Sequence, residues 1–329
     1  MNGKNLRALG TYGFLVLMII FFGLTTHNFF TFSNLINILI QITPVVIAAS
    51  AVTLLMVSGS LDLSVGGVLA LSGVVSAGLA STGMPLILAF AGGVAIGLVV
   101  GLVNGALVVG LGINPVIATL GTLYATTGAA WLLTGGSTSV APNNEAFADL
   151  GTGRIGPIPV MVIVMAVTVA LFVFLERRTL LGKYSVAIGS NFEGSRLAGV
   201  KVNFYRVLLF MLAGVACGIA GIINASQLSG GQPSVGSGFE FAIIVAAVVG
   251  GVSLAGGRGT VLGTLGGAAI IGVIHVALNL NFVDPFWQQI IEGILLVGVV
   301  AIDVLLARDF RRPQWLSFRT KQQETTVQV

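Results

Sequence analysis

Long runs of apolar residues, separated by short polar or glycine-rich joints, extend along this chain from residue 9 to residue 306. A helix needs about 20 apolar residues to cross the hydrocarbon core of a bilayer. The pattern predicts ten such helices, with breakers such as Asn114-Pro115 and Asp284-Pro285 between them. The expected spans are roughly 9–25, 40–58, 64–82, 86–110, 115–134, 158–176, 206–225, 239–254, 261–280 and 286–306. The segments 40–80 and 239–254 are the least regular, and a broken or re-entrant helix near Asp62 is an alternative there.

The composition agrees with lipid as the main solvent of this chain. Of its 329 residues, 56% are hydrophobic and only 8% are charged, whereas about 25% of a soluble domain is charged. Cys217 is the only cysteine, which excludes an internal disulfide and a cysteine metal cluster. We therefore expect an all-α polytopic membrane bundle, with one transmembrane domain over 1–312 and a tail over 313–329.

The basic residues predict the orientation of the bundle. If the N-terminus lies in the cytoplasm, ten spans place 14 of the 15 Lys and Arg residues on that side and only Arg154 outside. This distribution follows the positive-inside rule and predicts that both termini are cytoplasmic. Because the basic residues follow the topology in this way, the net charge of +4 does not indicate a nucleic-acid partner.

One polar stretch, residues 177–206, interrupts the apolar pattern and carries six of the basic residues. Ser190 and Glu193 have the spacing of a capping box, and Gly199 can end a helix in the left-handed conformation. We expect a short helix near 191–198 within a cytoplasmic loop. Two turns of helix are marginal alone, so this helix needs either a protein partner or the lipid headgroups to lie on.

Motifs of catalysis are missing from the sequence. Gly-Lys occurs only at Gly3-Lys4 and Gly182-Lys183, without the other residues of a P-loop, and the chain contains no GxSxG and no HExxH. We expect a protein that is not an enzyme. If it drives transport with ATP, a separate chain must hydrolyse the nucleotide.

Polar side chains at membrane depth are costly, and they are therefore candidates for a translocation path or gate. Most are hydroxyls and amides, which suit a neutral polyhydroxylated solute better than an ion. The candidates are Asp62, Asn104, Asn114, Thr119, Gln227, Glu240 and Glu292. Each has a plainer alternative: Asp62 could cap the next helix, Glu240 begins the eighth span on the outer side, and the amides could bond between helices.

Four motifs resemble the membrane permease subunits of bacterial ABC importers for monosaccharides, of the ribose, arabinose, xylose and autoinducer-2 type. The similarity covers roughly residues 10–306. The motifs are Ser58-Gly-Ser-Leu-Asp-Leu-Ser-Val-Gly66, Asn104-Gly105 with Ile113-Asn-Pro-Val-Ile-Ala-Thr-Leu-Gly121, Ala187-Ile-Gly-Ser-Asn191 with Ser195-Arg-Leu-Ala-Gly-Val200, and Gly221-Ile-Ile-Asn-Ala-Ser226 with Gly250-Gly-Val-Ser-Leu254 and Gly256-Gly-Arg-Gly259.

The resemblance implies partners in the bacterial inner membrane and on both its sides. These are an ATP-binding subunit that carries ATP and Mg, a second permease copy or a homologous permease, and a periplasmic sugar-binding protein; no cofactor is expected in this chain. The third motif looks like the segment that docks on the ATPase, with Asn191, Glu193, Arg196 and Leu197 as contacts.

The sugar stays open at this point. After Phe239-Glu240, Phe241-Ala242 replaces the Leu-Asp pair that is usual in the family. The alternative function is a proton-coupled secondary transporter or a channel, which would need a titratable relay within the membrane. His275 and two carboxylates give that alternative little support.

Overall fold

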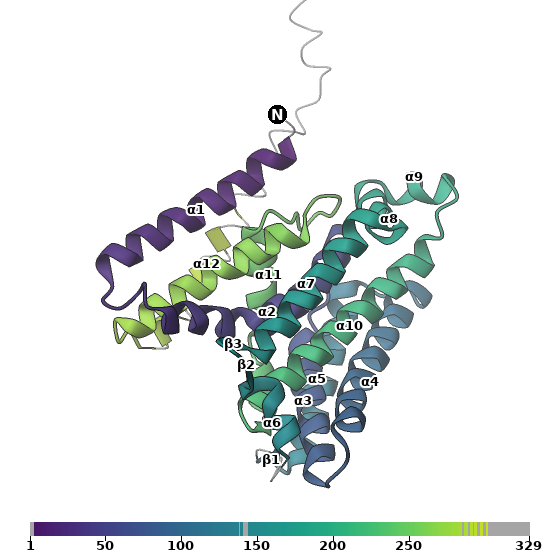
Figure 1. Ribbon diagram of the computed structural model, residues 1–329. Coiled ribbons are helices and arrows are strands. Elements are labelled where there is room, and N and C mark those ends of the chain that lie inside the picture. Colours follow the sequence, from purple (N-terminus) through teal and green to yellow (C-terminus); the bar gives the residue numbers. More distant parts are fainter. Residues whose placement is uncertain are drawn as a thin grey trace, which may run out of the picture.

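The structure is a computed structural model that describes residues 3–137, 139–140 and 144–284, together with scattered positions between 286 and 301. Helices make up most of it (Figure 1). Among the described residues, six helices are long and apolar enough to cross a membrane. The chain is therefore a polytopic helical membrane protein, as its hydropathy predicts.

Up to residue 280 the helices follow the predicted spans in order, with added short elements, whereas the tenth predicted span, 286–306, lies largely outside the described residues. They are α1 Gly3–Thr25, α2 Phe32–Val57, α3 Val65–Ser81, α4 Leu86–Gly105, α5 Pro115–Thr134, α6 Glu145–Thr152, α7 Val160–Arg178, α8 Leu180–Ser190, α9 Phe192–Leu197, α10 Val202–Gln227, α11 Phe239–Val249 and α12 Val261–Leu280. A π-helical turn, Ala106–Gly110, continues α4, and a 3-10 turn, Pro233–Gly236, precedes α11. Two short antiparallel pairs join β1 Ser139–Val140 to β4 Gly230–Gly231, and β2 Arg154–Ile155 to β3 Ile158–Pro159.

Helix α10 lies at the centre of the bundle, packed against α2, α3 and α4. Glycines allow this close approach: a Cβ at Gly97 of α4 would overlap the backbone at Gly214 of α10, and a Cβ at Gly214 would overlap Gly97. The four-residue glycine spacing on α4 therefore serves helix packing. The opposite side of α4, including Ile87, Val99 and Leu102, is exposed and apolar.

Helix α2 begins eight residues before the expected start. Thr31 is its N-cap, and the Thr31 hydroxyl accepts from the Asn34 amide at 3.3 Å. The polar Asn34 lowers the local hydropathy, but this side chain is buried and donates to the Phe29 carbonyl at 2.8 Å. An averaged hydropathy therefore places the start of the helix too late.

The eighth predicted span, 239–254, is wrong in its extent. Helix α11 has only 11 residues. The irregular segment before it lies along α3, where Gly231 meets Val74 and Gly236 meets Gly66 with no room for a Cβ. The chain therefore packs along α3 as an irregular segment, through Gly231 and Gly236, and becomes helical only at Phe239.

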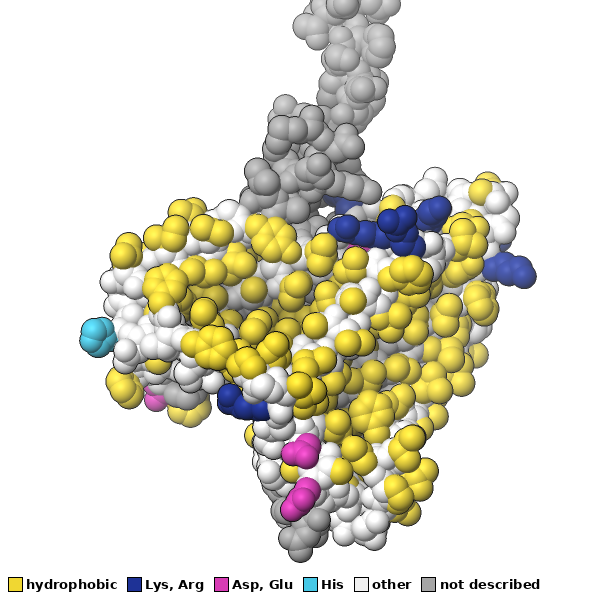
Figure 2. All heavy atoms as spheres, in the orientation of Figure 1, with side chains coloured by type: hydrophobic (Ala, Val, Ile, Leu, Met, Phe, Trp, Pro, Cys, Tyr) yellow, Lys and Arg dark blue, Asp and Glu magenta, His cyan; other side chains and the backbone are white. Residues whose placement is uncertain are grey.

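The surface divides into bands that suit a bilayer. Figure 2 shows hydrophobic side chains over most of the visible flank and Lys and Arg gathered mainly at the end that carries α8 and α9. We call this end of the molecule the basic end. Helix α10 runs from the basic end to the opposite end, where α6 lies (Figure 1).

Candidate functional site

The connection between α2 and α3, residues 58–64, is not helical, and most of it is buried in the bundle. Ser60, Asp62 and Ser64 are all buried. Buried backbone outside regular structure needs other hydrogen-bond partners. Here the side chains of the connection and of two neighbouring helices supply them.

Asp62 accepts three hydrogen bonds through its Oδ1 atom. The Ser64 amide donates at 2.8 Å, the Ser64 hydroxyl at 2.6 Å and the Asn104 side-chain amide at 3.5 Å. Asp62 thus forms a local turn with the N-cap residue of α3 and does not cap the first turn of the helix itself. The Asp62 carboxylate thereby joins the connection between α2 and α3 to Asn104 on α4.

Further bonds extend this cluster to α5. The Asn104 side-chain amide donates to the Ser64 hydroxyl at 2.8 Å, and the Thr122 hydroxyl donates to the Asn104 side-chain oxygen Oδ1 at 2.7 Å. The Leu63 amide donates to the Thr119 hydroxyl at 3.0 Å. We call this set the Asp62 network; it consists of Asp62, Ser64, Asn104, Thr119 and Thr122.

Three of the seven predicted path residues, Asp62, Asn104 and Thr119, therefore meet in one place. Sequence reasoning did not select Ser64 as a site residue. The sequence does contain a signal for Ser64, the alternation Ser60-x-Asp62-x-Ser64. An Asp side chain often accepts a hydrogen bond from the backbone N–H two residues later, and here that N–H belongs to Ser64.

Glu240 lies near the start of α3. It is buried in the first turn of α11, with its carboxylate beside Gly66, only one residue beyond the N-terminus of α3. Among the described residues, its Oε2 atom has no hydrogen-bond partner. The segment before α11 carries the chain along α3, and this path brings Glu240 close to Gly66.

The other predicted path residues do not join this site. Asn114 is exposed and caps α5, accepting from the Val116 amide at 2.9 Å. Gln227 ends α10 far from the basic end, where its backbone contacts Gly151 of α6. Glu292 lies outside the described residues.

The polar stretch forms two helices, α8 and α9, where a loop with one short helix was expected. Helices α7 and α10 also extend into it, to Arg178 and from Val202, so the connection is shorter than 177–206. The helix near 191–198 is confirmed as α9, and Gly199 has the expected positive φ of 82°.

The predicted capping box is wrong. Ser190 is the last residue of α8, and Asn191 caps α9 by accepting from the Gly194 amide at 2.8 Å. Glu193 instead pairs with Arg196 across 2.8 Å on the exposed face. Leu197 is 83% exposed, so α9 presents an apolar side chain beside an ion pair.

The first, third and fourth motifs meet where α8 ends, at Gly59, Gly189 and Gly256-Gly257. A Cβ at Gly189 would overlap the Val57 carbonyl and approach the Gly257 amide, and the Gly257 amide donates to Val57 at 2.7 Å. Gly256 lies against Gly59 with similar closeness. The contact joins the polar stretch to the connection that carries Asp62 through backbone alone.

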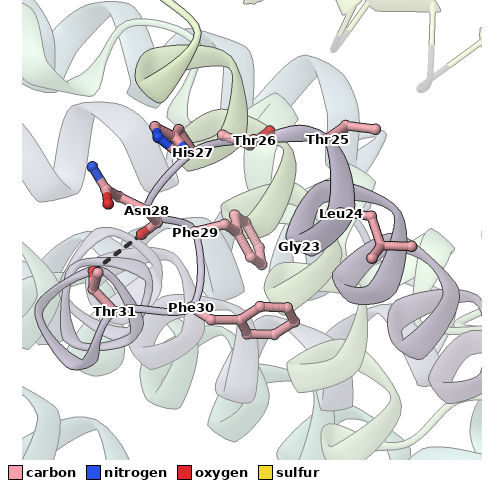
Figure 3. Close-up of a pocket in the computed structure, with 9 residues that line it drawn as sticks. All are labelled: Gly23, Leu24, Thr25, Thr26, His27, Asn28, Phe29, Phe30 and Thr31. Carbon is pink, nitrogen blue, oxygen red and sulfur yellow. Dashed lines mark hydrogen bonds between the residues drawn. The ribbon is translucent and has the colours of Figure 1, made fainter.

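A surface hollow of about 460 Å³ lies at the turn between α1 and α2 (Figure 3). One contiguous segment, Gly23 to Thr31, lines it, and the Thr31 hydroxyl donates to the Asn28 carbonyl at 3.1 Å within it. None of its lining residues belongs to the Asp62 network. Among the described residues the lining comes from one turn, and Asn281 after α12 donates to its Thr26 hydroxyl at 2.9 Å.

A bundle of apolar helices around a buried polar network, with a basic end that carries two surface helices, defines a multi-pass helical membrane protein. Residues 34–300 match the family described as the permease component of the branched-chain amino acid transport system. The chain belongs to this family.

Curated relatives resemble the chain over most of its length. The ribose import permease protein of Escherichia coli K12 is 35% identical over 292 residues, which cover 88% of this chain and 91% of the relative. The L-arabinose ABC transporter permease protein of Azospirillum brasilense is 38% identical, with 85% and 82% covered. The D-allose transport system permease protein of Escherichia coli K12 is 33% identical, with 91% and 92% covered. No solved structure matches the chain.

Proposed function

We propose that this chain is the permease subunit of an ATP-driven ABC importer and forms the passage for a monosaccharide or a similar small polyol. The observation that carries the proposal is its similarity over most of its length to permeases named for ribose, arabinose and allose. The family description names branched-chain amino acids, but the Asp62 network consists mainly of hydroxyl and amide groups, which suit sugar hydroxyls. A permease component forms the passage and performs no chemical reaction itself.

We further propose ten spanning helices with both termini in the cytoplasm of a bacterium, in its inner membrane. The transmembrane domain covers 1–312, and a cytoplasmic tail covers 313–329. The position of the basic end supports this orientation, because cytoplasmic ends of spans carry Lys and Arg. Arg177 and Arg178 end α7 at the basic end, whereas Arg154 precedes the start of that helix.

The proposed partner at the basic end is an ATP-binding subunit that carries ATP and Mg. Its contacts on α9 are Asn191, Glu193, Arg196 and Leu197. The exposed Leu197 beside the Glu193–Arg196 pair supports this docking, since a short helix with an exposed apolar tip favours a protein surface. A second permease copy or a homologous permease and a periplasmic sugar-binding protein complete the proposed importer.

In the proposed cycle, ATP binding moves α9, and the bundle opens to accept a sugar from the binding protein. Asp62, Asn104, Thr119 and Glu240 are proposed to act at the gate or in the passage. The buried, unpaired Glu240 oxygen is a free acceptor for a sugar hydroxyl. Asn114, Gln227 and Glu292 stay candidates for other parts of the path.

Uptake into proteoliposomes tests this function. They contain the permease, the ATP-binding subunit and the sugar-binding protein from the same genomic neighbourhood. Radiolabelled ribose, arabinose and allose are offered separately, with ATP or with a non-hydrolysable analogue. We expect uptake of at least one sugar that requires hydrolysable ATP. Uptake that ignores ATP but stops with an uncoupler would instead support the proton-coupled transporter.

A charge exchange tests the docking on α9. Glu193→Lys with Arg196→Glu keeps an ion pair on the helix but inverts the charges that face the partner. We expect normal insertion and about a tenfold lower uptake per ATP hydrolysed. Arg178→Glu, at an exposed position at the end of α7, is the control. Normal uptake by the exchanged variant would contradict the assignment of these contacts.

A further inference from the structure

Arg206 links the polar stretch to the buried connection between α2 and α3. It lies in the second turn of α10, and its Nη2 and Nε atoms donate to the Ser60 hydroxyl at 3.2 Å and 3.4 Å. Ser60 is almost completely buried and lies two residues before Asp62. The guanidinium therefore holds the start of the segment that carries the Asp62 network.

The same guanidinium also contacts α9. Its central carbon lies 5.6 Å from the centroid of the Phe192 ring, within the range of a cation–π interaction. Phe192 is the first residue of α9. No carboxylate among the described residues forms an ion pair with Arg206. Its guanidinium contacts the Phe192 ring and the Ser60 hydroxyl.

The contacts continue from Ser60 into three helices. Two residues of extended chain, about 7 Å, separate Ser60 from Asp62. Asp62 then holds Ser64 at the start of α3 and Asn104 on α4, and Thr122 on α5 donates to Asn104. A path of contacts thus runs from Phe192 through the Arg206 and Ser60 side chains, and then through two residues of backbone, to the Asp62 network.

We propose that Arg206 is a positioning residue that transmits the movement of α9 to the Asp62 network. This inference rests on the proposed function, in which an ATP-binding subunit moves α9. The planar guanidinium can stack on a ring and donate two bonds at once, which the point charge of a lysine cannot reproduce. The backbone contact at Gly189 is a separate link that changes at Arg206 leave in place.

Four substitutions test the link in the reconstituted importer. Arg206→Lys keeps the charge, Ser60→Ala removes the acceptor, and Phe192→Leu removes the ring, whereas Phe192→Tyr keeps the ring. Uptake of radiolabelled ribose, arabinose or allose and the release of inorganic phosphate are measured in the same proteoliposomes. Lys201→Gln removes an exposed charge five residues before Arg206 and serves as the matched control.

We expect the first three variants to lower the sugar imported per ATP hydrolysed about three- to tenfold. Phe192→Tyr and the Lys201→Gln control should stay within about twofold of the wild type. The ATP-binding subunit should copurify in equal amounts with all variants. Arg206→Lys combined with Phe192→Leu should lose no more than either change alone, because both break one link.

An unchanged ratio of sugar to ATP in Arg206→Lys and Phe192→Leu would overturn the proposal, and so would additive losses in the double variant. If Arg206→Lys is not recovered as a monodisperse protein, Ser60→Ala and Phe192→Leu carry the test. Failure of the wild type to import any of the three sugars with ATP would instead contradict the proposed function. The two failures are therefore distinguishable.

Discussion

Asp62 and Glu240 are two buried carboxylates near the start of α3, and their surroundings differ. Asp62 accepts three hydrogen bonds on one oxygen atom and belongs to a network that ties α3, α4 and α5 together. Glu240 lies beside Gly66 on α11, and its Oε2 has no partner among the described residues. Depth in the membrane alone would assign both the same role.

The difference supports the proposal that Asp62 maintains the structure, whereas Glu240 is one of the residues proposed to contact the solute. Burial of a polar group is costly unless it is hydrogen-bonded, so an unpaired buried oxygen calls for a functional explanation. The bonds of Asp62 explain its burial without a solute. The comparison predicts that substitutions at the two sites separate stability from transport.

The largest loss of stability is expected for Asp62→Ala. It leaves the Ser64 amide and the Ser64 hydroxyl without this acceptor, at about 1–3 kcal/mol for each buried donor left unpaired. Thermal unfolding in detergent can be followed with a thiol-reactive dye, because the only cysteine, Cys217, is buried. Asp62→Asn keeps an acceptor oxygen and should lose less. If Asp62→Ala were as stable as the wild type, the structural role assigned to Asp62 would be contradicted.

An effect on transport rather than stability is expected for Glu240→Gln. A neutral amide costs less to bury than a carboxylate, so the free energy of unfolding should change by less than about 1 kcal/mol. Sugar uptake should fall about tenfold, because the charged acceptor is lost. Glu145→Gln, at an exposed position on α6, is the control. A loss of stability as large as that of Asp62→Ala would show that Glu240 has a structural partner.

The smallest effect is expected for Thr122→Val. It removes one donor to the Asn104 side-chain oxygen Oδ1 and should cost about 1 kcal/mol in the same unfolding measurement. The Asp62–Ser64 bonds stay in place. A loss as large as that of Asp62→Ala would identify Asn104, and not Asp62, as the centre of the network.

Much of the fold could be predicted from local pattern. The starts of α4 and α5 at Leu86 and Pro115 agree with the predicted spans, because Pro85 and Asn114-Pro115 are strong breakers. The glycines spaced four residues apart on α4, Gly93, Gly97 and Gly101, are a local pattern that marks the packed face of this helix. The boundaries failed where polar residues are buried, as at Asn34 in the first turns of α2.

The site was predictable only in part. Buried polar residue types selected Asp62, Asn104 and Thr119, which do meet, but they also selected Asn114, which is an exposed helix cap. The Asn114-Pro115 pair marks a helix start locally, but which of the other polar residues meet depends on which helices face each other. Arg206 was counted only as a basic residue of the polar stretch, since its partners Ser60 and Phe192 are distant in sequence.

The sequence by itself determined that the chain is a helical membrane protein, where most helices begin and end, and which motifs it shares with sugar permeases. Length, hydropathy and breakers act locally, and each can be read along the chain. Only the tertiary structure decided that three motifs meet at Gly189 and that Glu240 lies near the start of α3. Both arrangements require that segments far apart in the sequence approach each other closely at a glycine. Such contacts form only when the helices pack together, so they cannot be read from the local sequence.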